Sequence, residues 1–437
     1  MMADRNTIYA LASAPGRGGV AVVRVSGKKA LHCLNTLTKK ENIAPRAAHL
    51  YTLYNGDGAS IDTALCLSFP APASYTGEDV VEFHIHGGKA VLAALYQAIS
   101  AIDGLRMAEP GEFTRRAVEN GKLDLTQAEA IADLVDAQTE MQRRQAVRQY
   151  GGALTQLYES WRSELMQILA LTEAAIDFAD EEIPDDTVNV AGLKVDALKT
   201  AIEQHLNDGR RGEILREGLK LAIIGPPNAG KSSLVNALTA REVAIVSDEA
   251  GTTRDVIEVR LDLGGYPVIL ADTAGLRNAA GKIEAEGVRR AIGAAKTADL
   301  VVLLRDGTLP DDGMDLGTIT APVLKVWNKA DQPWPVPRDG LAISVRTGHG
   351  IDLLLDAITR AAKDRTEADG DAPLTRPRHR EALRAALASL VRAGVATEPE
   401  LFAEDVRLAL RAIGRITGSV DVENILDIVF REFCLGK

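Results

Sequence analysis

The chain has 437 residues, 46% hydrophobic and 25% charged, which is typical of a globular protein of two to four domains. Its net charge of −11 argues against a broadly basic surface for nucleic acids, so any contact with RNA has to be local. No apolar run approaches the length of a membrane span, and the first residues lack a signal-peptide core and an arginine-rich transit pattern, so we expect a cytoplasmic protein without a membrane partner.

Residues 1–119 predict a mixed domain of strands and helices, with strand patterns at residues 19–27 and 79–86. Residues 16–19 match the G-x-x-G loop of a KH RNA-binding module, but that loop joins two helices and this one leads into a strand, which favours a turn or a substrate loop. Glu82 shares a strand face with two histidines. That spacing suits a metal, although a polar strand face is the better interpretation because no further ligand is nearby.

The pattern becomes helical between residues 120 and 215. Apolar residues recur there every three to four positions, at Ala128, Ile131, Leu134, Val135, Leu154, Leu157, Trp161, Leu165 and Leu169. This spacing predicts long helices that pack against one another. An acidic stretch at residues 177–186 interrupts them, and we expect an exposed turn there because its carboxylates repel one another and Pro184 disfavours helix before it.

Two basic stretches, residues 142–148 and 376–384, lie in or beside helical patterns. Either can touch phosphate, although solvated helix faces are the more common case. The three cysteines are odd in number and widely spaced, which indicates neither a disulfide framework nor a zinc cluster. We expect Cys33 and Cys66 to be buried and Cys434, near the C-terminus, to be accessible.

A phosphate-binding loop is predicted at residues 225–233, where the sequence GPPNAGKSS joins a strand pattern at residues 219–224 to a helical pattern. Glycines let backbone N–H groups point at phosphate oxygens, and the helix N-terminus adds a favourable dipole. Lys231 is expected to reach the β- and γ-phosphates, and the Ser232 hydroxyl to bind Mg²⁺.

Two further segments complete the predicted phosphate and Mg²⁺ site. The DTAG sequence at residues 272–275 follows a strand pattern at residues 267–271, so Asp272 can hold Mg²⁺ through water and Gly275 can approach the γ-phosphate. Upstream, Thr253 lies in a GTTRD sequence and can close on Mg²⁺ as a switch loop does.

The base is predicted to be guanine. The NKAD sequence at residues 328–331 follows an apolar strand expected at residues 323–327, and the Asp331 carboxylate can accept two hydrogen bonds from guanine that adenine cannot supply. Residues 344–346 complete the pocket. Leu276 stands where signalling GTPases commonly carry a glutamine that orients the attacking water, so another group has to do so. Glu284 is a candidate, but from position alone a solvated carboxylate at a helix start is the favoured interpretation.

The GTPase region ends at a plausible linker, residues 367–373, after which helical patterns resume. This order predicts that the GTPase domain is inserted into a helical domain. Movement of its switches could then load a common helical platform.

Residues outside the nucleotide motifs indicate a family. They are APGRGG at 14–19, YTGED at 75–79, AEPGEFT at 108–114, LDLTQAEA at 123–130 and CLGK at 434–437. In these segments, and from end to end, the chain resembles the tRNA uridine 5-carboxymethylaminomethyl modification GTPases, the MnmE or TrmE family. Leu435 and the Ser344-Val345-Arg346 sequence depart from the family's usual isoleucine or valine and Ser-Ala-Lys.

The resemblance implies a multidomain chain that combines α/β and all-α parts. An N-terminal α+β folate-binding and dimerisation domain would occupy residues 1–119, and a central helical domain would occupy residues 120–216 and 374–437. A Ras-like P-loop GTPase domain would be inserted at residues 217–373.

The resemblance also implies a function. The chain would be a K⁺-stimulated GTPase that works as a homodimer with an FAD-containing partner of the MnmG type. Together they would add an aminomethyl or carboxymethylaminomethyl group to C5 of the wobble uridine of tRNA. The one-carbon unit would come from 5-formyl- or methylene-tetrahydrofolate, and FAD would be bound only by the partner.

The family's site residues transfer to this sequence position by position. By resemblance, the folate site consists of Arg24, Glu82, Lys122 and Lys437. Glu284 would be the catalytic glutamate and Cys434 a cysteine needed for the tRNA reaction. The nucleotide would contact Asn228, Ala229, Gly230, Lys231, Ser232, Ser233, Ser247, Asp248, Glu249, Ala250, Gly251, Thr252, Thr253, Asp272, Thr273, Ala274, Gly275, Asn328, Lys329, Ala330, Asp331, Ser344, Val345 and Arg346.

Two metal ions accompany the nucleotide in this interpretation. Mg²⁺ would bind Ser232 and Thr253, whereas K⁺ would replace an arginine finger at Asn228, Ser247, Glu249 and Thr252. The alternative function is a ribosome-assembly or RNA-chaperone GTPase without modification chemistry. That class normally carries an RNA-binding appendage or a basic tail, and neither is evident here.

Overall fold

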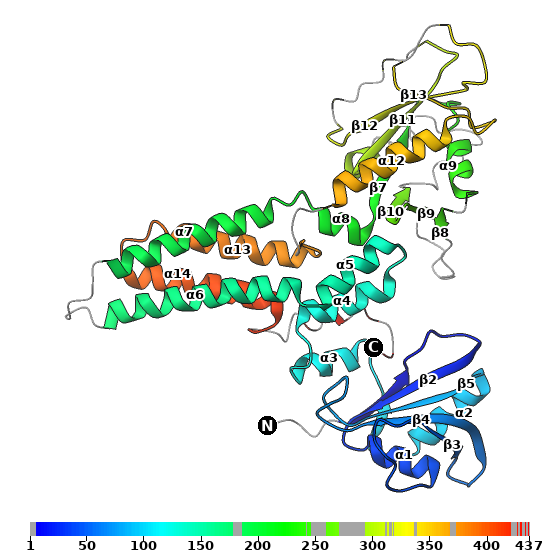
Figure 1. Cartoon of the computed structure of the whole chain (residues 1–437), viewed down its shortest axis with the longest axis vertical. Helices are drawn as coiled ribbons and strands as arrows, with labels where there is room; N and C mark the ends of the chain where they lie inside the picture. The colour runs from blue at the N-terminus through cyan, green and yellow to red at the C-terminus, as the bar shows by residue number, and fades with distance from the viewer. Residues whose placement is uncertain are drawn as a thin grey trace. The chain divides into compact units, whose positions relative to one another are not determined.

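The structure is a computed structural model of the chain (Figure 1). It describes residues 6–177, 186–241, 243–245, 259–270, 293–310, 313, 317, 319–335, 339–367, 373–420, 426, 429, 430, 433 and 436. The chain divides into two compact units, Met1–Ala132 with Ile413–Lys437, and Asp133–Ala412.

In the first unit, a mixed sheet is covered by helices. Its described strands follow the order β3-β4-β5-β2-β1-β6, antiparallel except for the parallel pair β1 and β6. Apolar residues of the sheet and of α1 and α2 form its core. The elements are β1 (Thr7–Leu11), β2 (Gly18–Ser26), α1 (Ala30–Thr38), β3 (His49–Tyr54), β4 (Ser60–Phe69), β5 (Val80–Gly87), α2 (Lys89–Ser100) and β6 (Leu105–Met107).

The alternation of side chains along β2 and β5 places two charged groups on the same face. Val23 and Val25 of β2 are fully buried, so Arg24 between them points to the opposite face of the sheet. Glu82 is the direct partner of Arg24 in the register of β2 and β5. The predicted strands at residues 19–27 and 79–86 are confirmed within one residue at each end. Cys33 and Cys66 are buried, as expected.

Helices α3 (Glu112–Glu119) and α4 (Leu125–Asp136) follow the sheet. Leu125 and Ala128 of α4 form an apolar cluster with the C-terminal Leu426, Val429, Phe430 and Phe433. The expectation that Leu134 and Val135 face a helical core was wrong, because their exposed fractions are 38% and 51%. They lie in the last turn of α4, beyond this cluster.

The second unit begins with α5 (Glu140–Tyr150), α6 (Ala153–Asp177), α7 (Asp186–Leu206) and α8 (Arg211–Glu217). Figure 1 shows α6 and α7 side by side with α13 (Pro377–Ala393) and α14 (Pro399–Thr417). Leu154, Trp161 and Leu165 of α6 are buried, which confirms the helical spacing. Segments far apart in the sequence therefore build one bundle.

Two arginines of the basic stretch at residues 376–384 differ from the expected solvated helix face, whereas Arg384 is exposed. Arg376 is 7% exposed and pairs with Asp133 at 2.7 Å. Arg380 is 8% exposed and pairs with Asp208 and Glu213. Both guanidinium groups form ion pairs within the helical part instead of facing solvent, because a buried charge requires a close partner of opposite charge.

The remaining part of the second unit is a doubly wound α/β layer. Its described strands follow the order β13-β12-β11-β7-β10-β9-β8, and strands β10, β7, β11, β12 and β13 are parallel. Buried apolar residues cover both faces of the sheet. The elements are β7 (Leu219–Ile224), α9 (Lys231–Thr239), β8 (Ala244–Ile245), β9 (Val259–Leu263), β10 (Tyr266–Leu270), β11 (Leu300–Asp306), β12 (Val323–Asn328), β13 (Leu341–Ala342) and α12 (Ile351–Thr366).

Among the described residues, we find no helix whose length and apolar character would suffice for a bilayer crossing.

Candidate functional site

Three predicted nucleotide segments meet at one edge of the α/β sheet. The phosphate-binding loop follows β7, residues 328–331 begin with the last residue of β12, and residues 344–346 follow β13. Because these strands are parallel, their carboxyl ends lie at the same edge, where ligands of such sheets bind. The topology therefore joins segments that are separated by about a hundred residues.

Two glycines shape the phosphate-binding loop by close backbone approach. Gly225 has φ +148°, and a Cβ there would collide with the Leu304 carbonyl on the neighbouring strand β11. Gly230 has φ +98°, and a Cβ there would collide with the Asn328 side-chain amide. A side chain at either position would push the loop off the sheet edge.

Lys231 opens helix α9 and folds back over the loop. Its Nζ donates hydrogen bonds to the carbonyl oxygens of Gly225, at 2.9 Å, and Pro226, at 2.8 Å. Burial lowers the pKa of Lys231. Ser232 and Ser233 follow it and are exposed in the first turn of α9, where backbone N–H groups attract anions. This end of the helix has the donors and the cation that a phosphate requires.

Asn328 connects the phosphate-binding loop to the segment after β13. Its Nδ2 donates to the Ala229 carbonyl at 2.8 Å, and its Oδ1 accepts from the Val345 backbone N–H at 3.1 Å. Asn328 is 5% exposed, so both bonds are shielded from water. One side chain therefore holds two parts of the candidate nucleotide site in register.

The Asp331 carboxylate is held in a fixed orientation. It accepts a hydrogen bond from Ser344 Oγ at 2.6 Å and pairs with Arg346 Nη2 at 2.6 Å. The hydrogen bond from Ser344 and the nearby Arg346 charge lower the pKa of Asp331, which keeps it ionised. An ionised, fixed carboxylate suits a base that offers two adjacent N–H donors.

Sequence reasoning missed Asp306, which ends β11 beside Lys329. Asp306 is 7% exposed and its carboxylate pairs with Lys329 Nζ. Burial acts to raise the pKa of Asp306, but the hydrogen bonds from Lys329 and Thr308 outweigh it and hold the pKa low. Trp334 Nε1 also donates to the Lys329 carbonyl at 3.2 Å. Lys329 is thus fixed at both ends by residues that no local motif identifies.

Other predicted site residues lie outside the described part of the chain. They are Ser247, Asp248, Glu249, Ala250, Gly251, Thr252, Thr253, Asp272, Thr273, Ala274, Gly275, Glu284, Cys434 and Lys437. Asn228 is described, and it is exposed with φ +61° in the phosphate-binding loop.

A second polar site lies in the first unit, around Arg24 and Glu82. Arg24 Nε donates to Glu82 Oε1 at 2.9 Å, and both side chains are about one-fifth exposed, at 20% and 19%. The Arg24 guanidinium also lies over the Tyr75 ring at 5.1 Å and near the Phe113 ring at 5.6 Å. A half-buried ion pair with aromatic walls can bind a flat, polar heterocycle.

Lys122 belongs to the same unit and is exposed. Its aliphatic stem lies against Gly77, where an added Cβ would stand 3.2 Å from Lys122 Cγ. Gly77 is two residues from Tyr75. The loop between β4 and β5 therefore connects Lys122 with the aromatic wall beside Arg24.

The two histidines beside Glu82 have separate partners. His84 Nε2 lies 3.6 Å from Glu82 Oε2, whereas His86 Nδ1 lies 2.8 Å from Asp62 Oδ1. Within the described ranges, no group of three or more His, Cys, Asp or Glu side chains is arranged to hold a metal ion.

Comparison with known proteins places these sites in a family context. The model of the MnmE helical domain matches residues 125–434, and the model of the GTP-binding protein TrmE N-terminus matches residues 7–122. The tRNA modification GTPase MnmE of Parvibaculum lavamentivorans is 56% identical and aligns over 99% of this chain and 100% of its own. The protein of that name from Paramagnetospirillum magneticum is 54% identical and aligns over 99% of both chains.

Among solved structures, the G domain of the T. maritima FeoB iron transporter is 26% identical in the matched part. It covers 33% of this chain and 98% of its own, with a TM-score of 0.24. The family of this chain is shown by the relatives that align over its full length and by the two family models.

Proposed function

Because this chain belongs to the MnmE family of tRNA modification GTPases, we propose that it hydrolyses GTP and takes part in modifying tRNA. The observation that carries the proposal is the meeting of the phosphate-binding loop with the Asn328, Asp331 and Ser344 segments at one sheet edge. Lys231 would neutralise phosphate charge, and Asp331 would select guanine.

Metal ions would complete the nucleotide site. Mg²⁺ at Ser232 and Thr253 would offset negative charge on the phosphates, and K⁺ at Asn228, Ser247, Glu249 and Thr252 would add a positive charge beside them. The exposed Ser232 hydroxyl at the start of α9 fits a hard cation, which prefers oxygen ligands. Residues 272–275 would contact the γ-phosphate, and Glu284 would orient the attacking water.

The tRNA reaction would use the second site. Arg24, Glu82, Lys122 and Lys437 would bind a 5-formyl- or methylene-tetrahydrofolate, with Glu82 accepting from pterin N–H groups and the cations binding carboxylates. The half-buried Arg24–Glu82 pair beside Tyr75 supports this assignment. An MnmG-type partner would supply FAD, and the product would carry an aminomethyl or carboxymethylaminomethyl group at C5 of the wobble uridine.

The remaining parts of the proposal concern assembly. The chain would work in the cytoplasm as a homodimer, with a folate-binding domain at residues 1–119. The helical domain would occupy residues 120–216 and 374–437, with the GTPase domain inserted at 217–373. Cys434 would serve the tRNA reaction.

The activity with K⁺ gives a test of the GTPase part. We expect GTP hydrolysis at saturating Mg²⁺ to be faster in KCl than in NaCl at equal ionic strength. The Asn228→Ala variant should lose that difference, while Gly264→Ala, in the β9–β10 turn, should retain it. Equal rates of the wild-type chain in both salts would contradict the K⁺ mechanism.

A further inference from the structure

The loop between β4 and β5 forms one wall of the Arg24–Glu82 site. Its Tyr75 ring lies under the Arg24 guanidinium, and the Tyr75 hydroxyl is 2.8 Å from Thr114 Oγ1 on α3. Its Gly77 has φ +77° and packs against Asn120 and Lys122 after α3. The position of this loop therefore determines where Tyr75 and Lys122 stand relative to Arg24.

The loop is fixed to the sheet by hydroxyl groups. Ser26 Oγ, at the end of β2, lies 2.7 Å from Thr76 Oγ1 and donates to Glu78 Oε2 at 2.8 Å. Ser26 and Thr76 are fully buried, so these contacts do not compete with water. Asn120 Nδ2 donates to the Thr76 carbonyl at 2.7 Å and connects the same loop to the segment that carries Lys122.

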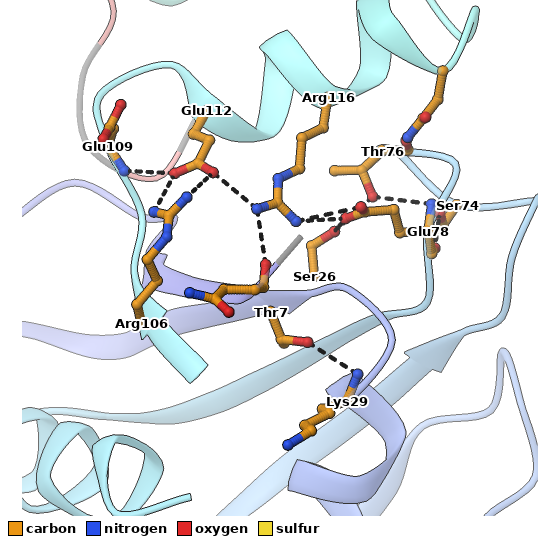
Figure 2. A network of polar contacts seen from close by, with 12 residues as sticks. Thr7, Ser26, Lys29, Ser74, Thr76, Glu78, Arg106, Glu109, Glu112 and Arg116 are labelled. Atoms are coloured by element: carbon orange, nitrogen blue, oxygen red, sulfur yellow. Dashed lines mark hydrogen bonds and ion pairs between the residues drawn. The ribbon is translucent and has the colours of Figure 1, made fainter. Parts of the chain in front are cut away.

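Glu78 connects this arrangement to a buried arginine on α3 (Figure 2). Arg116 Nη1 lies 3.0 Å from Glu78 Oε2, and Arg116 Nη2 donates to Glu112 Oε1 and to the Asn6 carbonyl, both at 2.9 Å. Arg116 is 2% exposed. A charge so deeply buried requires all these acceptors, which leaves the loop and α3 with one favoured relative position.

The far side of this network does not reach the loop. Arg106 on β6 forms a bidentate pair with Glu112, with distances of 2.8 and 2.6 Å. Burial acts to raise the pKa of Glu112, but Arg106, the Glu109 N–H and Arg116 together lower it. Figure 2 shows Arg106 and Glu78 at opposite ends of the network. Arg106 thus supports α3 without contacting the wall of the site.

We propose that Glu78 and Arg116 are positioning residues for the one-carbon donor, acting through the loop that carries Tyr75 and Gly77. The proposal rests on the proposed folate site. Neither side chain is required to contact the ligand. Instead, their ion pair holds the loop against α3, and through Tyr75 and Gly77 it fixes the aromatic wall and Lys122 relative to the Arg24–Glu82 pair.

Binding of 5-formyl-tetrahydrofolate to the full chain tests this role, with the dissociation constant and the melting temperature measured for each variant. Glu78→Gln removes the charge that pairs with Arg116 and should weaken binding about tenfold, the effect of one charged hydrogen bond. Arg106→Gln is the matched control, because it breaks an ion pair in the same network. It should lower the melting temperature and change the dissociation constant by less than about twofold.

Two further variants test the same role if Glu78→Gln does not fold. Asn120→Ala releases the loop through one hydrogen bond and should also weaken folate binding. The double variant Tyr75→Phe with Asn120→Ala should lose less folate-binding free energy than the two single variants lose in sum, because both act through the same loop. The positioning role would be overturned if all variants bound the folate as tightly as the wild-type chain. It would also be overturned if Arg106→Gln lost folate affinity in proportion to its lower melting temperature, as Glu78→Gln does. A wild-type chain that does not bind the folate would instead refute the proposed donor.

Discussion

Gly230 ends the phosphate-binding loop at a backbone angle that suits glycine, and we expect Gly230→Ala to separate the loop from Asn328. The residue has φ +98°, and an added methyl group would displace the Asn328 amide. That amide donates to the Ala229 carbonyl and accepts from the Val345 N–H. One methyl group therefore disturbs both the phosphate and the base segments.

The expected cost combines two effects. Positive φ in a residue with a Cβ costs about 1–2 kcal/mol. Loss of one buried hydrogen bond of Asn328 costs about 1 kcal/mol more. The loop of Gly230→Ala should relax away from this strained geometry and would have to regain it to bind nucleotide. The sum of about 2–3 kcal/mol then corresponds to nucleotide binding that is roughly 30- to 150-fold weaker, since about 1.4 kcal/mol is a factor of ten.

The assay is fluorescence titration of the full chain with a labelled GDP, together with thermal unfolding. Gly264→Ala is the matched control, because Gly264 also has positive φ, +63°, but an added Cβ would stand at an ordinary 3.5 Å from Thr359. It should lower stability and leave GDP affinity unchanged. Wild-type affinity in Gly230→Ala, or an equal loss of affinity in both variants, would refute the reasoning.

Three further predictions follow from individual side chains. Burial lowers the pKa of His205 from 6.5 to about 4. Between these two pH values, the His205 imidazole is neutral in the folded chain and binds a proton in the unfolded chain. The free energy of unfolding should thus fall by up to about 3 kcal/mol as the pH drops from 6.5 to about 4. In denaturant titrations, His205→Gln should flatten this dependence of the unfolding free energy on pH. Asp331→Asn should weaken GDP binding at least about tenfold in the same titration and favour xanthine nucleotides, whereas unchanged base preference would contradict the pocket. Asp133 accepts from Arg216 at 2.9 Å and Arg376 at 2.7 Å, so Asp133→Asn should cost about 3 kcal/mol in unfolding free energy, and an unchanged melting temperature would count against it.

Local patterns in the sequence identified the strands that carry the site. The strand expected before the phosphate-binding loop is β7 with the same ends, and the strand before residues 328–331 is β12, one residue longer. These strands are mostly apolar runs bounded by turn residues, so their signal is local. The strand expected at residues 267–271 is β10, Tyr266–Leu270, displaced by one residue.

The ion pairs that could not be predicted from the sequence join residues far apart along the chain. Arg380 looks like one residue of a basic helix face, but its acceptor Glu213 lies 167 positions earlier. Asp306 belongs to no motif, yet β11 places it beside Lys329 because the strands are parallel. Glu78 and Arg116 are likewise ordinary charges until the loop and α3 come together. Tertiary pairing of this kind leaves no periodic signal.

The most direct test of the central claim is nucleoside mass spectrometry of total tRNA from cells that lack this gene. Cells complemented with the wild-type chain would be compared with cells complemented with Lys231→Ala. We predict that 5-carboxymethylaminomethyl- or aminomethyl-type wobble uridines disappear in the deletion and return with the wild-type chain alone. Unchanged wobble uridines in the deleted cells would contradict the tRNA-modification function and would favour a role in ribosome assembly.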